Sequence, residues 1–192
     1  MGLISELSVT DPFSARAARG QVFYGSDADQ NDMVTGQTSF ANTTPTFALV
    51  NPINSRVLVV PLMVRLVQAG TVAGADIDIL MEIDGAPARF TSGTAETIKC
   101  SRTAAQFQDT ARAGLYSTVT AAAGYGMVVD QQRLGPDISA AEAAVQQYYW
   151  GPSGSLDYID PGGCLLIHTY AGTTGPTWMW GIKWAEIPLS EV

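Results

Sequence analysis

The strongest constraint on the fold is an alternating apolar segment near the end of the chain. In residues 178–185 the even positions hold Trp178, Trp180, Ile182 and Trp184, and the odd positions hold Met179, Gly181, Lys183 and Ala185. A period of two indicates a half-buried β-strand. An aromatic face of this size needs a second sheet or a second subunit to cover it. The segment therefore predicts a layered β structure, and it carries no pattern of catalytic residues.

Further segments with strand character are separated by turns rich in Gly, Pro, Asn and Thr. We predict strands over 21–24, 46–51, 56–69, 76–84, 97–101, 114–120 and 125–130, before a C-terminal pair. In 56–69 one face holds Leu58, Val60, Leu62, Val64 and Leu66. Pro61 lies on the opposite face and cannot donate a backbone hydrogen bond, which indicates an edge position or a bulge. Residues 139–148 are the best helix candidate, because Ser139 and Glu142 make a capping box.

Many short strands and at most one or two short helices predict an all-β protein, an antiparallel β-sandwich of the jelly-roll type. An immunoglobulin-type sandwich is the alternative, but the lone Trp between the two cysteines, Trp150, lies in a turn. Residues 1–20 lack β alternation and are expected to form an N-terminal arm with a short helical turn. Residues 21–192 are expected to form one domain.

The charge balance limits the possible partners. The net charge is −8, only two of the ten basic residues are lysines, and the arginines form no dense cluster. Nucleic-acid binding needs a basic footprint, and an anionic membrane would repel this chain. No apolar run is long enough for a transmembrane helix, and the N-terminus shows no secretory signal. We therefore expect no nucleic-acid partner and no membrane partner.

Candidates for catalysis are few. The single histidine, His168, shares a strand face with Cys164, but four residues of strand separate their backbones by roughly 13 Å. Cys100 and Cys164 fit buried apolar positions better than a metal site, and a disulfide between them stays open. A carboxylate pair for glycoside hydrolysis is conceivable, but we favour a solvated outer strand face for this acidic group: Asp76, Asp78, Glu82 and Asp84. The expectation is no enzyme and no cofactor.

One loop resembles the start of a calcium site. Asp27, Asp29 and Asn31 occupy the first, third and fifth positions of an EF-hand pattern. The sixth position is Asp32 instead of Gly, and the twelfth is Thr38 instead of Glu. These three residues are therefore weak candidates for a looser cation site, and a solvated polar turn is the simpler interpretation.

The aromatic residues of the C-terminal half fit a core or a protein interface better than a sugar-binding platform. As interface residues we predict two groups of aromatics and three residues of the arm: Trp178, Trp180, Trp184, Tyr148, Tyr149, Trp150, Phe13, Arg16 and Arg19.

Two stretches resemble a known class of proteins. One is Ile159-Asp-Pro-Gly-Gly-Cys-Leu-Leu-Ile-His-Thr-Tyr170 with Trp178-Met-Trp-Gly-Ile-Lys-Trp-Ala-Glu-Ile-Pro188, and the other runs from Leu49 to Val64. Together they resemble structural proteins of tailed-bacteriophage virions, through turn-and-strand patterns covering about a quarter of the chain. The resemblance implies a jelly-roll decoration (cement) protein on the outer surface of the capsid, made in the host cytoplasm. It also implies a homotrimer whose other partner is the major capsid protein.

Two other functions stay open as alternatives. A receptor- or carbohydrate-binding module of a phage fibre or tail would use an exposed aromatic groove, with Tyr149 or Trp150 as the residues to test. A glycan-active enzyme would use the acids of residues 76–84. For the decoration protein, we expect that deleting residues 1–20 leaves a folded domain that no longer binds capsids.

Overall fold

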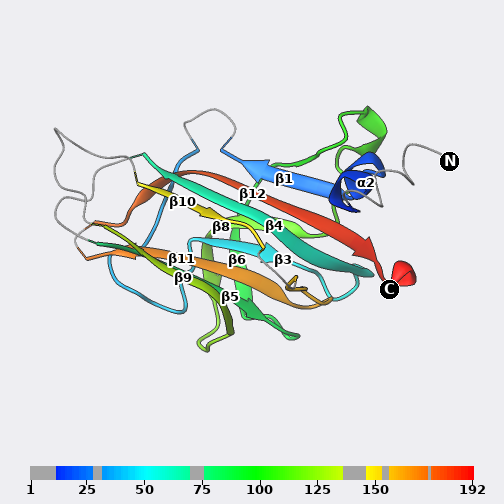
Figure 1. Cartoon of the computed structure of the whole chain (residues 1–192). Coiled ribbons are helices and arrows are strands. Elements are labelled where there is room, and N and C mark those ends of the chain that lie inside the picture. The colour runs from blue at the N-terminus through cyan, green and yellow to red at the C-terminus, as the bar shows by residue number, and fades with distance from the viewer. Residues whose placement is uncertain (1–11, 28–31, 70–75, 136–145, 153–155, 173) are drawn as a thin grey trace.

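The chain folds into two antiparallel β-sheets that pack face to face (Figure 1). The computed structural model describes residues 12–27, 32–69, 76–135, 146–152, 156–172 and 174–192. Every pairing between two of its strands is antiparallel. The predicted antiparallel β-sandwich is thus confirmed, and its jelly-roll type stays a prediction.

In the described part of the chain, each sheet contains six strands. Sheet A consists of β1 (Val22–Ser26), β2 (Val34–Thr35), β4 (Val57–Gln68), β7 (Ile98–Cys100), β10 (Gln147–Trp150) and β12 (Thr177–Pro188). Sheet B consists of β3 (Phe47–Val50), β5 (Ile77–Asp84), β6 (Phe90–Ala95), β8 (Gly114–Ala121), β9 (Met127–Leu134) and β11 (Cys164–Ala171). Among the described residues, the helical elements are α2 (Pro12–Ala18) and two short 3₁₀ turns, η1 (Ala105–Phe107) and η2 (Leu189–Glu191).

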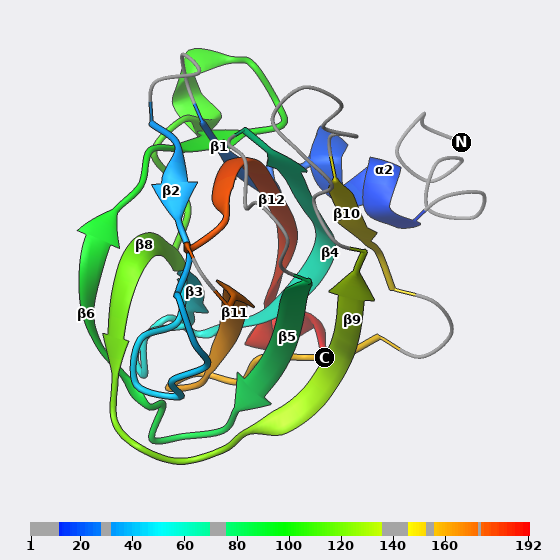
Figure 2. The same cartoon turned by 90° about the vertical axis from the view of Figure 1, so that its left-hand side faces the viewer.

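The chain crosses repeatedly from one sheet to the other. The strand order is β10-β4-β12-β1-β7 in sheet A, where β2 also pairs with β12, and β6-β8-β3-β11-β5-β9 in sheet B. The two longest strands, β4 and β12, lie side by side in the middle of sheet A. In the end-on view β10 and β9 border the same open side of the sandwich (Figure 2).

The core lies between the sheets and is built by the alternating strands. The apolar side of β5 faces it, as its period of two predicts, with Ile77, Ile79, Met81 and Ile83 all buried. The even positions of β12 face it from the other sheet, and Phe47 packs on Trp180 with ring centroids 5.3 Å apart. The three tryptophans are therefore covered by sheet B of the same chain.

A bulge near Pro61 changes which side of β4 is buried. The register between β4 and β12 shifts between Lys183 and Trp184, opposite Met63 and Pro61. Val57 and Val59 face the core before the shift, and Val64 and Leu66 face it afterwards. The prediction that Leu58, Val60, Leu62, Val64 and Leu66 share one face was therefore wrong, because the extra residue reverses the alternation. The bulge indicated by Pro61 is confirmed.

The helix candidate at residues 139–148 was wrong at its C-terminal end. Gln147 and Tyr148 belong to β10, which pairs with β4. Residues 139–145 lie outside the described residues.

In the predicted arm, residues 12–18 form the short helix α2, and residues 1–11 also lie outside the described part of the chain. Among the residues that are described, no helix is long and apolar enough to cross a membrane.

Candidate docking face

The outer face of sheet A carries three cross-strand rows of side chains that face away from the core. The first row holds Met63, Lys183, Tyr24 and Lys99. The second holds Tyr149, Arg65, Gly181 and Ser26, and the third holds Gln147, Val67 and Met179. We call these rows the docking face. Directly paired residues project to the same side of a sheet, so all three rows form one surface.

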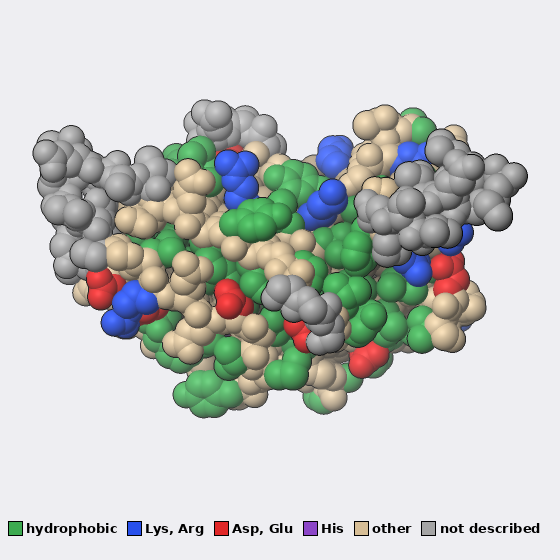
Figure 3. Space-filling view, in the orientation of Figure 1, with side chains coloured by type: hydrophobic (Ala, Val, Ile, Leu, Met, Phe, Trp, Pro, Cys, Tyr) green, Lys and Arg blue, Asp and Glu red, His purple; other side chains and the backbone are tan. Residues whose placement is uncertain are grey.

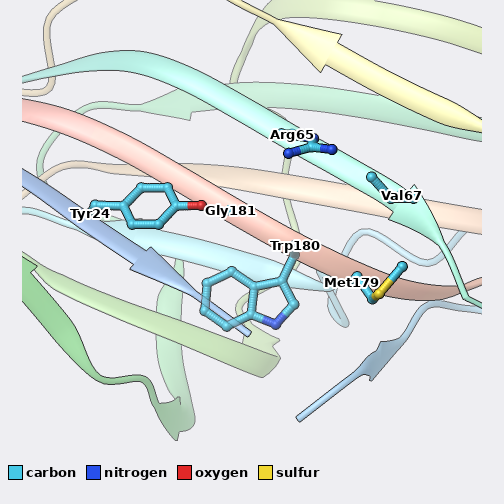
Figure 4. A pocket seen from close by; sticks show the side chains of 6 residues that line it. All are labelled: Tyr24, Arg65, Val67, Met179, Trp180 and Gly181. Atoms are coloured by element: carbon cyan, nitrogen blue, oxygen red, sulfur yellow. The ribbon is translucent and has the colours of Figure 1, made fainter. Parts of the chain in front are cut away.

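Tyr24 lies across the centre of this face, directly above a glycine. A Cβ atom at position 181 would lie only 2.2 Å from Tyr24 Oη, so the absence of a side chain there lets the ring lie flat on β12. Figure 4 shows the Tyr24 hydroxyl beside Gly181, with Arg65 and Val67 on the neighbouring strand β4 and Met179 farther along β12. Together with Trp180 these residues line a shallow groove of about 190 Å³.

The charged side chains of the docking face are all positive. Both lysines of the chain lie on it together with Arg65, and none of the three forms an ion pair with a described residue. No Asp or Glu occupies a position in the three rows. In Figure 3 most basic side chains in view lie around apolar ones over the upper part of the molecule, and acidic ones lie below. A chain of net charge −8 thus presents one cationic face.

The neighbouring part of the same sheet face is covered by α2. Phe13 and Ala17 pack against a small cluster formed by Val22, Val60 and Ala185. Arg16 donates hydrogen bonds to Gln21 and to Glu191, and Arg19 lies 4.0 Å from the same glutamate. The described half of the predicted arm therefore contacts its own chain, and Phe13 and Arg16 are engaged there.

Four of the predicted interface aromatics lie inside the protein. Trp178, Trp184 and Tyr148 are at most 1% exposed and Trp180 is 4% exposed, so another copy cannot reach them in the folded chain. The prediction was wrong for these four because the facing sheet provides the cover. Of the remaining two, Trp150 is half-buried against the core and Tyr149 is 68% exposed on the docking face.

The acidic residues of β5 do not form the solvated face that the sequence predicted. Glu82 is fully buried and Asp84 nearly so. Arg89 binds both, with Nη2 2.5 Å from Glu82 Oε1 and Nε 2.7 Å from Asp84 Oδ2. Glu82 also accepts a hydrogen bond from the Gly126 amide. The prediction was wrong at these positions because Arg89, from the turn after β5, folds back over them.

His168 completes this buried cluster. Its Nε2 lies 3.0 Å from Glu82 Oε1, and Phe40 packs on its ring. Burial lowers the pKa of His168, although the Glu82 carboxylate acts against this. Burial alone would raise the pKa of Glu82, but hydrogen bonds from Arg89 and Gly126 hold it below its ordinary value. The histidine is thus buried, in contact with both Glu82 and Phe40.

The two remaining acids of this group, Asp76 and Asp78, form ion pairs, and the two cysteines are not linked to each other. Arg133 holds Asp78 at 2.7 Å and Asp76 at 3.7 Å on the surface of sheet B. Cys100 and Cys164 are buried free thiols, so they form no disulfide. Burial raises the pKa of Cys164 to about 12, which keeps it protonated near neutral pH.

Of the three cation-loop candidates, only Asp27 lies within the described residues. Asp29 and Asn31 lie outside the described residues, and the Asp27 carboxylate accepts a hydrogen bond from the Asp32 amide. Among the described residues, no three His, Cys, Asp or Glu side chains are grouped to hold a metal ion.

Comparison with known proteins gives no relative. No family model, no curated protein and no solved structure matches this chain. Interpretation of the docking face therefore rests on its own geometry. Sequence reasoning found Tyr149 but missed Tyr24, Arg65 and Lys183. For Lys183 and Gly181 the sequence did hold a signal. They occupy odd positions of the alternating segment, whereas the buried tryptophans occupy even ones, so they lie on the opposite face of the strand.

Proposed function

We propose that this chain is a non-enzymatic structural protein of a bacteriophage virion, a decoration protein that bridges capsid subunits on the outside of the head. In this proposal the protein forms a homotrimer and binds the major capsid protein through the docking face. The resemblance of the two strand-and-turn stretches to virion proteins supplies the class, and the structure supplies a surface suited to the task.

The observation that carries the proposal is the open outer face of sheet A. Protein interfaces are enriched in Tyr, Met and Arg, and this face presents Tyr24, Tyr149, Met179 and Arg65 together. The sheet beneath them is rigid because β4 and β12 pair along their length and the tryptophans fill the core below. A rigid sheet loses little conformational entropy when its side chains bind a partner.

Binding to phage heads tests this proposal. Purified protein is mixed with heads that lack it and sedimented, and the bound amount is measured against the free concentration. We expect saturable binding with a fixed number of copies per head, and light scattering of the free protein should give three chain masses. Heads that sediment without bound protein at micromolar concentrations would contradict the proposal.

A carbohydrate-binding module is the second candidate, because Tyr149 is exposed beside the groove. Sugar rings stack on exposed aromatic faces. Binding on a glycan array that is lost in Tyr149→Ala, without binding to heads, would favour this alternative. The groove itself, at about 190 Å³, is smaller than usual ligand pockets, which makes the docking role the better fit.

A further inference from the structure

We propose that the groove beside Tyr24 is a seat for a carboxylate side chain of the partner protein, with Arg65 as its principal ligand. The inference rests on the proposed docking role and adds the chemistry of the partner: an acidic protein surface that inserts an Asp or Glu side chain. The seat consists of the Arg65 guanidinium, the Tyr24 hydroxyl, the Gly181 floor and the apolar side chains of Val67 and Met179.

The donors of the seat are Arg65 and the Tyr24 hydroxyl, and both are available to a partner as far as the described residues are concerned. No hydrogen bond or ion pair joins Arg65 or the Tyr24 hydroxyl to a described residue. A guanidinium offers two parallel N–H groups that match the two oxygens of a carboxylate, and a phenol adds one O–H donor. Both groups flank Gly181, because Arg65 pairs with it across β4 and Tyr24 lies on it from β1.

The surroundings strengthen binding of an anion. Val67 and Met179 form an apolar wall, which lowers the local dielectric and increases the attraction between a guanidinium and a carboxylate. Lys183 lies one row away, paired directly with Tyr24, and adds a second positive charge. The volume of about 190 Å³ suits one inserted side chain rather than a free ligand of drug size.

Charge on the whole chain favours a protein over a nucleic acid as the source of the anion. Nucleic-acid binding gains most of its affinity from many phosphate contacts, whereas the docking face provides three cations. The net charge of −8 would repel a long polyanion, but it acts less on a local group of carboxylates at contact distance.

The seat can be tested on the isolated protein with poly-L-glutamate as the probe. NMR titration at low salt should shift the side-chain signals of Tyr24 and Arg65 in a saturable way, and neutral poly-L-glutamine should leave them unchanged. Arg65→Glu should weaken binding about tenfold or more. Arg65→Lys should weaken it less, because lysine keeps the positive charge but loses the two parallel N–H donors of the guanidinium. Unshifted Tyr24 and Arg65 signals would overturn the inference, whatever happens with heads.

The matched control is Arg56→Glu, which makes the same change in charge. Arg56 is exposed at the start of β4, roughly 30 Å along the strand from Arg65, and forms no ion pair with a described residue. In the head-binding assay Arg65→Glu should lose about tenfold or more in affinity and Arg56→Glu less than about twofold. Both variants should keep the thermal unfolding midpoint of the unchanged protein, because both side chains are exposed.

The outcomes separate the inference from the proposed function. If the unchanged protein binds heads and both variants bind equally well, the seat is wrong and the decoration role stands. If both variants weaken binding equally, the effect is general electrostatics and the seat is again wrong. Binding of single-stranded DNA tighter than poly-L-glutamate, lost in Arg65→Glu, would assign the seat to phosphate and overturn the protein partner. Absence of head binding by the unchanged protein contradicts the proposed function alone.

Discussion

Tyr148 donates a hydrogen bond from its hydroxyl to the Asp130 carboxylate, and this contact joins the edge strand of sheet A to the edge strand of sheet B. The same hydroxyl lies 3.2 Å from the sulfur of Met81 in the core. Burial and the neighbouring carboxylate raise the pKa of Tyr148, so its proton stays available for this bond. The two sheets are therefore fastened by a polar contact at an open side of the sandwich.

Removing the Tyr148 hydroxyl should destabilise the fold. Tyr148→Phe keeps the packing of the ring but leaves Asp130 without its donor from the other sheet. We expect a loss of about 1–2 kcal/mol in the free energy of unfolding, measured by urea denaturation. Tyr149→Phe is the control and should change stability by less than about 0.5 kcal/mol, because Tyr149 is exposed. Equal stability of the two variants would show that the contact does not fasten the sheets.

Arg89 should be among the most sensitive positions in sheet B. Arg89→Met removes the cation between Glu82 and Asp84 and leaves two buried carboxylates without it. We expect a cost of about 3–5 kcal/mol, measured by denaturation. Arg133→Met breaks the exposed pair with Asp78 and should lower the denaturation midpoint far less, because solvent screens an exposed ion pair. A loss below 1 kcal/mol for Arg89→Met would contradict the importance assigned to this buried cluster.

Stability should fall in mild acid because of His168. Its pKa is lowered in the folded state, so unfolded chains bind the proton more readily. The stabilisation is present above the unfolded pKa of about 6.5 and is lost as the pH falls towards the lowered folded value. The slope should approach, at most, about 1.4 kcal/mol per pH unit between pH 6.5 and 5. In His168→Gln this slope should vanish in denaturation series across the same range, and a persisting slope would assign it to another group.

Two glycines should respond very differently to the same change. Gly181→Ala brings a Cβ to 2.2 Å from Tyr24 Oη, the end of a mobile side chain, so the ring can swing away at a cost of about 1 kcal/mol or less. Gly175→Ala brings a Cβ to 1.9 Å from the carbonyl oxygen of Gly36, which is backbone, and should cost about 2 kcal/mol or more. Thermal unfolding of both variants measures the contrast. Similar midpoints would contradict the close approaches at these positions.

The strands could be predicted where burial of one face leaves a clean period of two. Ile77–Asp84 and Thr177–Pro188 are examples, and both were found. In β4 the alternation reverses at a bulge, and the sequence shows only Pro61 as its sign. The sequence could not show what buries the tryptophans, because an apolar strand face has the same sequence pattern whether a second sheet or a second chain covers it. Only the packing of β12 against sheet B decides between these possibilities.

The polar sites were harder to predict because their partners come from distant segments. Alternation placed Glu82 and Asp84 opposite the core face but could not show that Arg89 folds over them or that His168 lies beside them on β11. The docking face combines residues from β1, β4, β7, β10 and β12, so it depends on the strand order. Within β12, the sequence indicated only that Lys183 and Gly181 lie on the face opposite to the tryptophans, because they occupy the alternate positions.

Footprinting of tyrosines on bound and free protein tests the central claim, that the outer face of sheet A docks on a partner. Tyr149 on this face and Tyr125 before β9 are 68% and 77% exposed, so both should react in the free protein with a reagent that labels accessible phenols. On phage heads we predict that Tyr149 becomes protected and Tyr125 stays reactive. Protection of Tyr125 with Tyr149 still reactive would contradict the account, because docking would then occur through another surface.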